Sequence, residues 1–310
     1  MAVPQSLTFR EKIYRINRKI RFLAKRGSLF SNKTRFFFHG EDYVKGTFTI
    51  IFLNSTFLFL LAYLVVSVIA QVATGISALA FDINTVLYYY GTNYLITGEK
   101  WSPDAVHTVF STGPIIAFMT GILFFLLYLS VITESGILRL LVLWMFVQSI
   151  VHFLGDMLMG ALFTKGFGYV IMYMFFMDTG KMLISVFAMV VMVSIGILTS
   201  RLFLFSGNIY FNYLNGNNRR KFIWAQFIYP FLTGNVILIL LKIPEITLFE
   251  VFTNATMLFV LLPVAILGMK SQDLFFDEDP RTMKLSIPLV VITVLLLLLY
   301  RIFFGIGVRV

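Results

Sequence analysis

The sequence lacks cysteine altogether, and charged residues make up only 13% of its 310 positions. Without cysteine the chain can form neither disulfide bonds nor thiolate metal sites, and the redox compartment stays undefined. Hydrophobic residues make up 59% of the chain, and the mean hydropathy is +0.88. Because low charge and high apolar content depart together from globular averages, a soluble domain is excluded. The composition predicts an all-α, polytopic transmembrane helix bundle.

Sequence motifs of common enzymes are missing as well. The chain contains no His-Glu-x-x-His, no Walker lysine motif, no Gly-x-Ser-x-Gly elbow and no dinucleotide fingerprint. We therefore assign no catalytic residue, no cofactor and no metal site, and we expect that the chain is not an enzyme.

Seven apolar stretches are long enough to cross a bilayer, which takes about 20 residues each. They lie near residues 47–72, 107–132, 137–163, 180–205, 222–242, 248–268 and 285–304. The predicted organisation is an arm at 1–46, a transmembrane domain at 47–304 and a short tail at 305–310.

The distribution of basic residues predicts the orientation of these spans. With the N-terminus inside, nineteen Lys and Arg residues fall on the inner side and six on the outer side. Eleven of the nineteen belong to the arm. Since positive residues favour the cytoplasmic side, we expect a cytoplasmic N-terminus and, after seven spans, an outer C-terminus.

The arm contains the pattern of a basic amphipathic helix. Thr8 and Glu11 form a capping box, apolar residues recur at helical spacing from Phe9 to Leu23, and Gly27 ends the pattern. The residues predicted to bind the membrane surface lie on the opposite face: Arg10, Lys12, Arg15, Arg18, Lys19, Arg21, Lys25 and Arg26. Such a helix lies in the interface against anionic head groups. The alternatives are a solvated arm that only sets orientation and, less economically, nucleic-acid binding.

His152 and Asp156 lie one helical turn apart inside the third predicted span. Ionisable groups at this depth cost about 2.5–3.5 kcal/mol on insertion scales, so they face protein or a water-filled cavity. We expect the pair to face inward. An ion pair between Asp156 and Lys181, with Asp178 near the outer mouth, would give a polar track in the outer half only.

Three interpretations of this polar intramembrane face stay open. The pair could be a structural or assembly clamp to a neighbouring helix, part of a proton or ion pathway, or part of a metal centre. One His with one or two Asp residues is a thin ligand set, because zinc sites normally use at least three strong protein ligands.

Two segments do not fit a simple up-and-down bundle. Residues 73–106 are rich in tyrosine, which predicts an interfacial or re-entrant helix, with a ligand-binding cap as the alternative. Residues 164–181 are apolar but too short to cross, so they could enter the membrane and return.

Two short segments carry a resemblance. "STGPIIAFMTGILFF" at 111–125 resembles the Gly-Pro span of site-2-protease-like intramembrane metalloproteases, and "FTNATMLFVLLPVAILG" at 252–268 is loosely similar to their later Asn/Pro segment. Without His-Glu-x-x-His the resemblance implies a non-catalytic relative. The chain as a whole resembles bacterial inner-membrane proteins, which implies that compartment.

These observations favour a non-catalytic subunit or scaffold of a larger inner-membrane assembly. Its expected partners are anionic lipid and other membrane protein subunits. The alternative is a small transporter or a proton- or ion-conducting subunit that uses the His152 and Asp156 face, and a third is the dead protease relative. The sequence has no convincing internal repeat, which counts modestly against a transporter.

Overall fold

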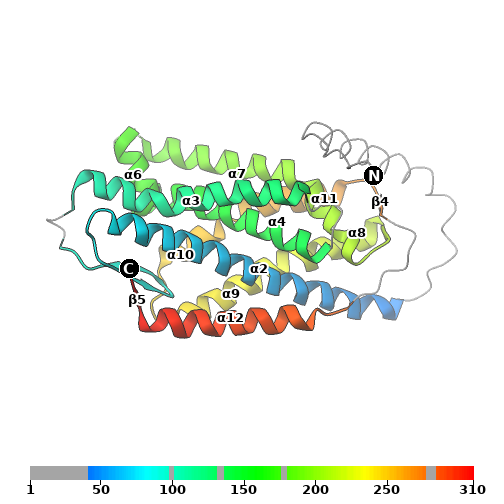
Figure 1. The fold of residues 1–310 in the computed structure, drawn as a ribbon. Helices are drawn as coiled ribbons and strands as arrows, with labels where there is room; N and C mark the ends of the chain where they lie inside the picture. The colour runs from blue at the N-terminus through cyan, green and yellow to red at the C-terminus, as the bar shows by residue number, and fades with distance from the viewer. Residues whose placement is uncertain (1–40, 98–100, 131–135, 176–179, 277–283) are drawn as a thin grey trace, which may run out of the picture.

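The computed structural model describes residues 41–97, 101–130, 136–175, 180–276 and 284–310. The predicted amphipathic helix of the arm lies outside the described residues. Within them, seven helical segments are long and apolar enough to cross a membrane. The predicted all-α bundle of seven spans is therefore confirmed (Figure 1).

Within the described residues, the seven spans are built from thirteen helical elements. Four spans are single α-helices or nearly so: α2 (Glu41–Leu79), α3 (Pro103–Ser130), α7 (Gly180–Phe205), which continues into η4 (Ser206–Ile209), and α12 (Ile287–Ile306). The third span comprises α4 (Gly136–Ile150), η2 (Val151–Gly155) and α5 (Asp156–Phe163). The fifth comprises α8 (Gly216–Ile223), η5 (Trp224–Ile228) and α9 (Tyr229–Lys242), and the sixth comprises α10 (Leu248–Ala255) and α11 (Leu258–Lys270).

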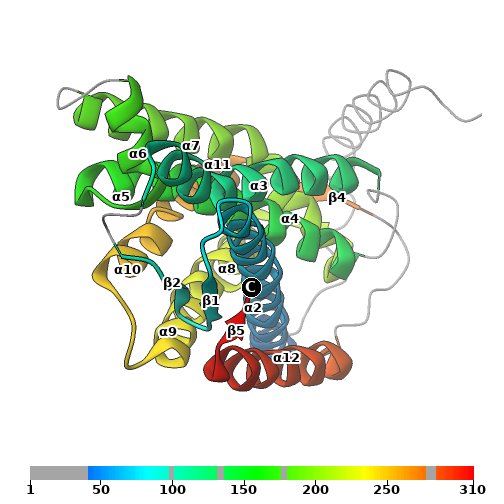
Figure 2. The same cartoon turned by 60° about the vertical axis from the view of Figure 1, so that its left-hand side comes forward.

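Short strands cover the two ends of the bundle. At one end, which we call the hairpin end, β1 (Thr85–Tyr88) pairs antiparallel with both β2 (Gly91–Tyr94) and β5 (Val308–Arg309). At the other end, which we call the arm end because α2 begins there, β3 (Tyr213–Leu214) pairs with β4 (Leu274–Phe275). Figures 1 and 2 show β5 and the end of α12 beside β1, far from the start of α2.

The hairpin corrects the prediction for residues 73–106, which contain no interfacial helix among their described residues. The β-branched and aromatic residues of "TVLYYYGTNY" suit extended pairing, and Gly91 adopts a φ of +156° beside the turn. Tyr94 packs against Trp101 and Phe110. Burial raises the pKa of Tyr94 to about 12, so its hydroxyl group stays neutral.

Helix α6 (Gly166–Phe175) does not cross the bundle but folds back against α5. The chain reverses at Thr164 and Gly166, both of which have positive φ. The two helices approach so closely at Gly168 that a Cβ there would overlap the Met157 carbonyl oxygen and the Ala161 backbone nitrogen. The expected reversal of this short apolar segment therefore takes the form of a tight helical hairpin.

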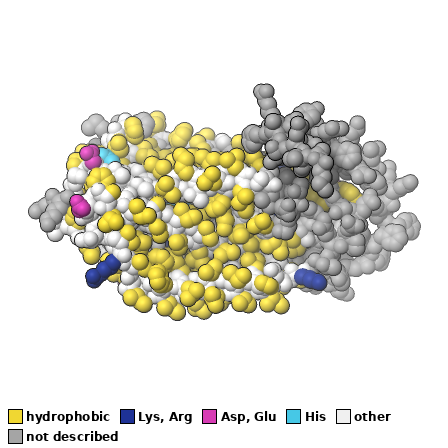
Figure 3. Space-filling view, viewed as in Figure 1, with side chains coloured by type: hydrophobic (Ala, Val, Ile, Leu, Met, Phe, Trp, Pro, Cys, Tyr) yellow, Lys and Arg dark blue, Asp and Glu magenta, His cyan; other side chains and the backbone are white. Residues whose placement is uncertain are grey.

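Hydrophobic side chains form both the core and the outer belt. In Figure 3 they cover the middle of the visible face, while the charged side chains in view lie towards its two ends. This distribution is typical of a protein surrounded by lipid.

Buried polar residues instead connect helices. The Asn54 side chain accepts from the Ser286 backbone N–H and donates to the Lys284 carbonyl, so it fastens the start of α12 to α2.

Candidate polar site in the hairpin half

The third span changes its helical geometry where His152 lies. Element η2 is a π-helix between two α-helices, and π-turns inside α-helices are frequent at functional sites. Four side chains that can hydrogen-bond recur every four residues through this region: Trp144, Gln148, His152 and Asp156. This spacing places them along one side of the span.

The sixth span is interrupted beside this π-helix. Helix α10 ends at Ala255 and α11 begins at Leu258, and the Thr256 hydroxyl donates to the Thr253 carbonyl at 2.6 Å. Gly155 lies directly against the interruption. A Cβ at Gly155 would lie 3.2 Å from the Thr253 carbonyl oxygen and would overlap the Thr256 hydroxyl. Glycine is therefore needed for the two interrupted spans to meet.

A partly buried ion pair joins the fifth and sixth spans close to this junction. Lys242 Nζ lies 3.3 Å from Glu250 Oε2, and Lys242 is only 7% exposed. The ammonium group also lies 5.9 Å from the centroid of the Tyr63 ring, on α2. Thr247 caps α10 by accepting the Glu250 N–H, which holds the start of that helix in place.

Tyr300 connects this ion pair to the hairpin. Its hydroxyl donates to the Tyr89 carbonyl at 2.9 Å, and Gln71 Nε2 donates to the Tyr300 oxygen at 3.4 Å. Arg301 stacks on the Tyr89 ring at 3.5 Å. Leu241, the residue before Lys242, packs against the hydrophobic cluster that contains Tyr300.

His152 lies next to the same group of side chains, because η2, which contains His152, packs against α10, which carries Glu250. We call the group the polar cluster and define it by five residues: Tyr63, His152, Lys242, Glu250 and Tyr300.

Asp156 lies one turn from His152 towards the hairpin end. Its carboxyl group faces the start of α6, where a Cβ at Gly166 would lie 3.3 Å from Oδ1. That oxygen is buried and has no hydrogen-bond partner among the described residues. A buried acceptor without a partner calls for an explanation such as a water or an ion.

The predicted ion pair between Asp156 and Lys181 is wrong. Within the described part of the chain, the ion pairs are Arg219–Asp273 at the arm end and Lys242–Glu250. Helix α6 folds over the Asp156 carboxyl group, while Lys181 lies at the start of α7. Asp178 and the basic residues of the arm lie outside the described residues.

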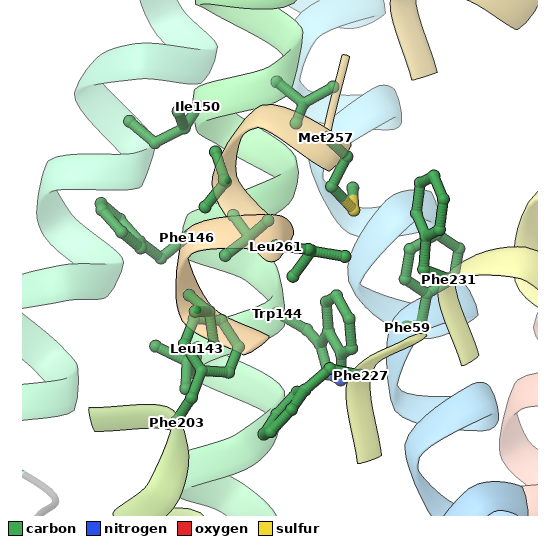
Figure 4. Packing of buried hydrophobic residues seen from close by; sticks show 14 of the residues in the cluster. Phe59, Leu143, Trp144, Phe146, Ile150, Phe203, Phe227, Phe231, Met257 and Leu261 are labelled. Atoms are coloured by element: carbon green, nitrogen blue, oxygen red, sulfur yellow. The ribbon is translucent and has the colours of Figure 1, made fainter. Parts of the chain in front are cut away.

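An aromatic layer lies on the arm-end side of the polar cluster. Trp144, Phe59, Phe203 and Phe227 are fully buried and pack edge to face, with ring centroids 5.2 Å apart for Phe59 and Trp144 and 4.8 Å apart for Phe203 and Phe227 (Figure 4). Trp144 Nε1 donates to the Ser55 hydroxyl at 3.1 Å. The layer separates the polar cluster from the arm end.

Two buried amides near this layer have unpartnered atoms. Gln148 lies between Trp144 and His152 in sequence, and its Nε2 has no partner among the described residues. Gln226 lies in the π-helix η5, and neither polar atom of its side chain is bonded within the described residues. Buried polar atoms without partners are costly in an apolar interior, so both amides indicate places where small polar species could bind.

Sequence analysis identified His152 and Asp156 but missed Tyr63, Lys242, Glu250 and Tyr300. One local signal was available, because Thr247 and Glu250 match the sequence pattern of a capping box near Lys242. The side chains of Tyr63 and Tyr300 carried no such signal, since aromatic residues are abundant throughout the chain.

Comparison with known proteins gives no relative for this chain. No protein-family model matches it, and neither a curated protein nor a solved structure is significantly similar to it. The resemblance to site-2-protease-like enzymes therefore stays a prediction. In the described residues no three His, Asp or Glu side chains come together in a way that could hold a metal ion.

Proposed function

We propose that this chain is a multi-pass protein of the bacterial inner membrane that binds and moves protons or small ions along a route formed by the polar cluster and the neighbouring Asp156. One observation carries the proposal: the π-helical turn of the third span meets the interruption of the sixth span beside a half-buried histidine and a partly buried Lys–Glu pair. The inner-membrane location rests on the resemblance of the chain to bacterial inner-membrane proteins, and the cytoplasmic N-terminus rests on the excess of basic residues at the arm end.

Interrupted helices at membrane depth have a recognised physical use. Backbone groups released from a regular helix must be satisfied by protein, water or a ligand, so such breaks occur where they are buried in protein or line a cavity. Transporters place ion and substrate sites at the ends of discontinuous helices for this reason. Ionisable side chains inside the membrane likewise mark ion or proton routes.

The packing favours this function over an assembly clamp at the same residues. A clamp to another protein needs the His152 and Asp156 face to be available, whereas this face packs against α6 and α10 of the same chain. A clamp within the chain would also be expected to pair its polar groups, and Asp156 Oδ1 has no partner among the described residues.

The aromatic layer gives the proposed route a direction. Glu250, whose side chain is 26% exposed, connects the polar cluster to the hairpin end, and the packed rings close the side towards the arm end. Movement across the whole membrane therefore requires this layer to rearrange, as in alternating access.

The test is proton flux in proteoliposomes, measured with an internal pH dye after a pH jump. Asp156→Asn keeps the shape of the side chain and removes its charge, so flux along the proposed route should fall to about a tenth or less. Asp104→Asn makes the same chemical change at an exposed position in the first turn of α3 and should retain wild-type flux. Equal flux from wild type and Asp156→Asn, or no flux above empty vesicles, would remove the proposal.

A second candidate is a non-catalytic subunit of a larger membrane assembly, and α12 favours it. Only 22% of the most apolar window of α12 is buried, the lowest share among the seven spans of the described residues. We expect stoichiometric membrane proteins to accompany the tagged protein through purification in mild detergent. Quantitative mass spectrometry of the purified sample identifies any such partners. A tagged protein that purifies alone would argue against this candidate.

A further inference from the structure

A groove at the arm end lies between α2 and the fifth span, on the surface of the bundle. It has a volume of about 520 Å³, and its walls include Phe48 and Phe52 of α2, Trp224 of η5 and Tyr229 of α9. Trp224 and Tyr229 are both exposed, and their rings pack together with centroids 5.6 Å apart. An aromatic, apolar groove at the end of a span lies at the level where the membrane interface is expected.

Two cations lie at the rim of this groove. Arg220 and Lys221 are exposed, and within the described part of the chain neither forms an ion pair with an acidic side chain. Lys221 Nζ lies 5.9 Å from the centroid of the Phe48 ring, so its charge is held over the apolar wall. The groove therefore combines an apolar body with a positively charged mouth.

This combination matches one class of ligand. An acyl chain would fill the apolar body, and a phosphate group would lie between Arg220 and Lys221, because guanidinium and ammonium groups both bind phosphate oxygens. The basic arm is a poorer occupant, since its positive residues would be repelled by the same two cations. A zwitterionic lipid offers no net negative charge to the mouth.

We propose that this groove binds an anionic phospholipid, with the head group held by Arg220 and Lys221 and an acyl chain packed along Phe52, Trp224 and Tyr229. The site lies at the opposite end of the bundle from the polar cluster, so this inference does not depend on the proposed ion or proton function.

Native mass spectrometry of the full chain tests the inference. The protein is transferred from detergent doped with either phosphatidylglycerol or phosphatidylcholine of matched acyl chains, and bound lipid is counted. A basic residue near anionic lipid contributes about a fivefold preference, so the Arg220→Gln, Lys221→Gln double variant should retain about 25-fold less phosphatidylglycerol than the wild type.

The control is the Arg201→Gln, Lys270→Gln double variant. It removes the same charge from two exposed positions outside the groove and should keep the wild-type preference. Equal retention of both lipids by the wild type, or equal losses in both double variants, would overturn the inference. Displacement of the bound lipid by glycerol phosphate would also overturn it, because a free phosphate compound would then be the ligand.

A second measurement keeps the test independent of the folding of the variants. Phosphatidylglycerol brominated on its acyl chain should quench Trp224 fluorescence more than brominated phosphatidylcholine does, with the Trp224→Phe variant providing the background of the remaining two tryptophans. Equal quenching by the two lipids would contradict a groove selective for anionic lipid.

Discussion

A lysine at the end of an apolar helix ordinarily extends its ammonium group towards the membrane surface. Lys242 instead turns inward, where it pairs with Glu250 and lies over the Tyr63 ring. Such an ion pair loses much of its hydration, so removing one of its charges costs more free energy than it would in an exposed pair. This is why we assign Lys242 to the polar cluster rather than to the surface charges that orient the spans.

Removing one member of this pair should destabilise the protein. Lys242→Met leaves Glu250 without its partner. The free energy of unfolding should fall by about 3 kcal/mol, the lower end of the usual loss, because Glu250 keeps some contact with solvent. Thermal unfolding in detergent, followed by circular dichroism, measures the change.

The matched control removes both charges. The Lys242→Met, Glu250→Gln double variant should recover most of the loss, because neither charge is then left buried alone. A single variant as stable as the wild type, or a double variant as unstable as the single one, would show that the pair is not coupled in this way.

For individual residues, the sequence identified the polar side chains inside the membrane better than it identified the residues that they contact. An intramembrane His and Asp four residues apart already imply a polar face, and the structure packs that face against its own chain. The wrong pairing with Lys181 arose because partners depend on how distant segments pack, here on the return of α6 over Asp156. For the same reason, no pattern near Tyr300 could predict its contact with Tyr89.

Among the elements, the helical hairpin of α5 and α6 depends on a very close backbone approach. Gly168→Ala would place a methyl group against the Met157 carbonyl, and backbone atoms cannot move aside as a flexible side chain can. We expect a loss of about 1–3 kcal/mol, the usual cost of overpacking. Thermal unfolding and flux should both be affected, because the hairpin covers Asp156.

Gly305→Ala is the control for this element. A Cβ at Gly305 has no neighbour within 4 Å, so the substitution adds no strain within the described structure. Replacing glycine with alanine inside a helix stabilises it by up to about 1 kcal/mol, so stability should be unchanged or slightly higher. Equal effects of the two alanine variants would contradict the proposed role of Gly168.

The spans themselves could be predicted because their length and apolar content are local properties. All seven lie where the sequence indicated, with ends that differ by a few residues. The β-hairpin could not be distinguished from an interfacial helix, because tyrosine and tryptophan suit both. The interruptions at η2 and between α10 and α11 were also hidden, since neither coincides with a proline or an obvious change in composition.

On the scale of the whole molecule, the polar cluster lies towards the hairpin end while the basic groove lies at the arm end. The basic residues predict that the hairpin faces outwards. Because the chain lacks cysteine, single cysteines can test this directly. An impermeant maleimide should label Asn93→Cys, on β2, in intact cells, and should label Asn217→Cys, on α8, only after permeabilisation. The reverse pattern would contradict the orientation.

The measurement that most directly tests the proposed route through the polar cluster is the accessibility of position 152 to water. A cysteine reacts with a charged methanethiosulfonate only as the thiolate, which needs an aqueous environment. In proteoliposomes, the His152→Cys variant should react with the reagent. The Leu198→Cys variant should not, although Leu198 is 78% exposed, because its surroundings are lipid. Failure of His152→Cys to react, while Asn93→Cys reacts fully, would show a dry cluster and contradict a route for protons or ions.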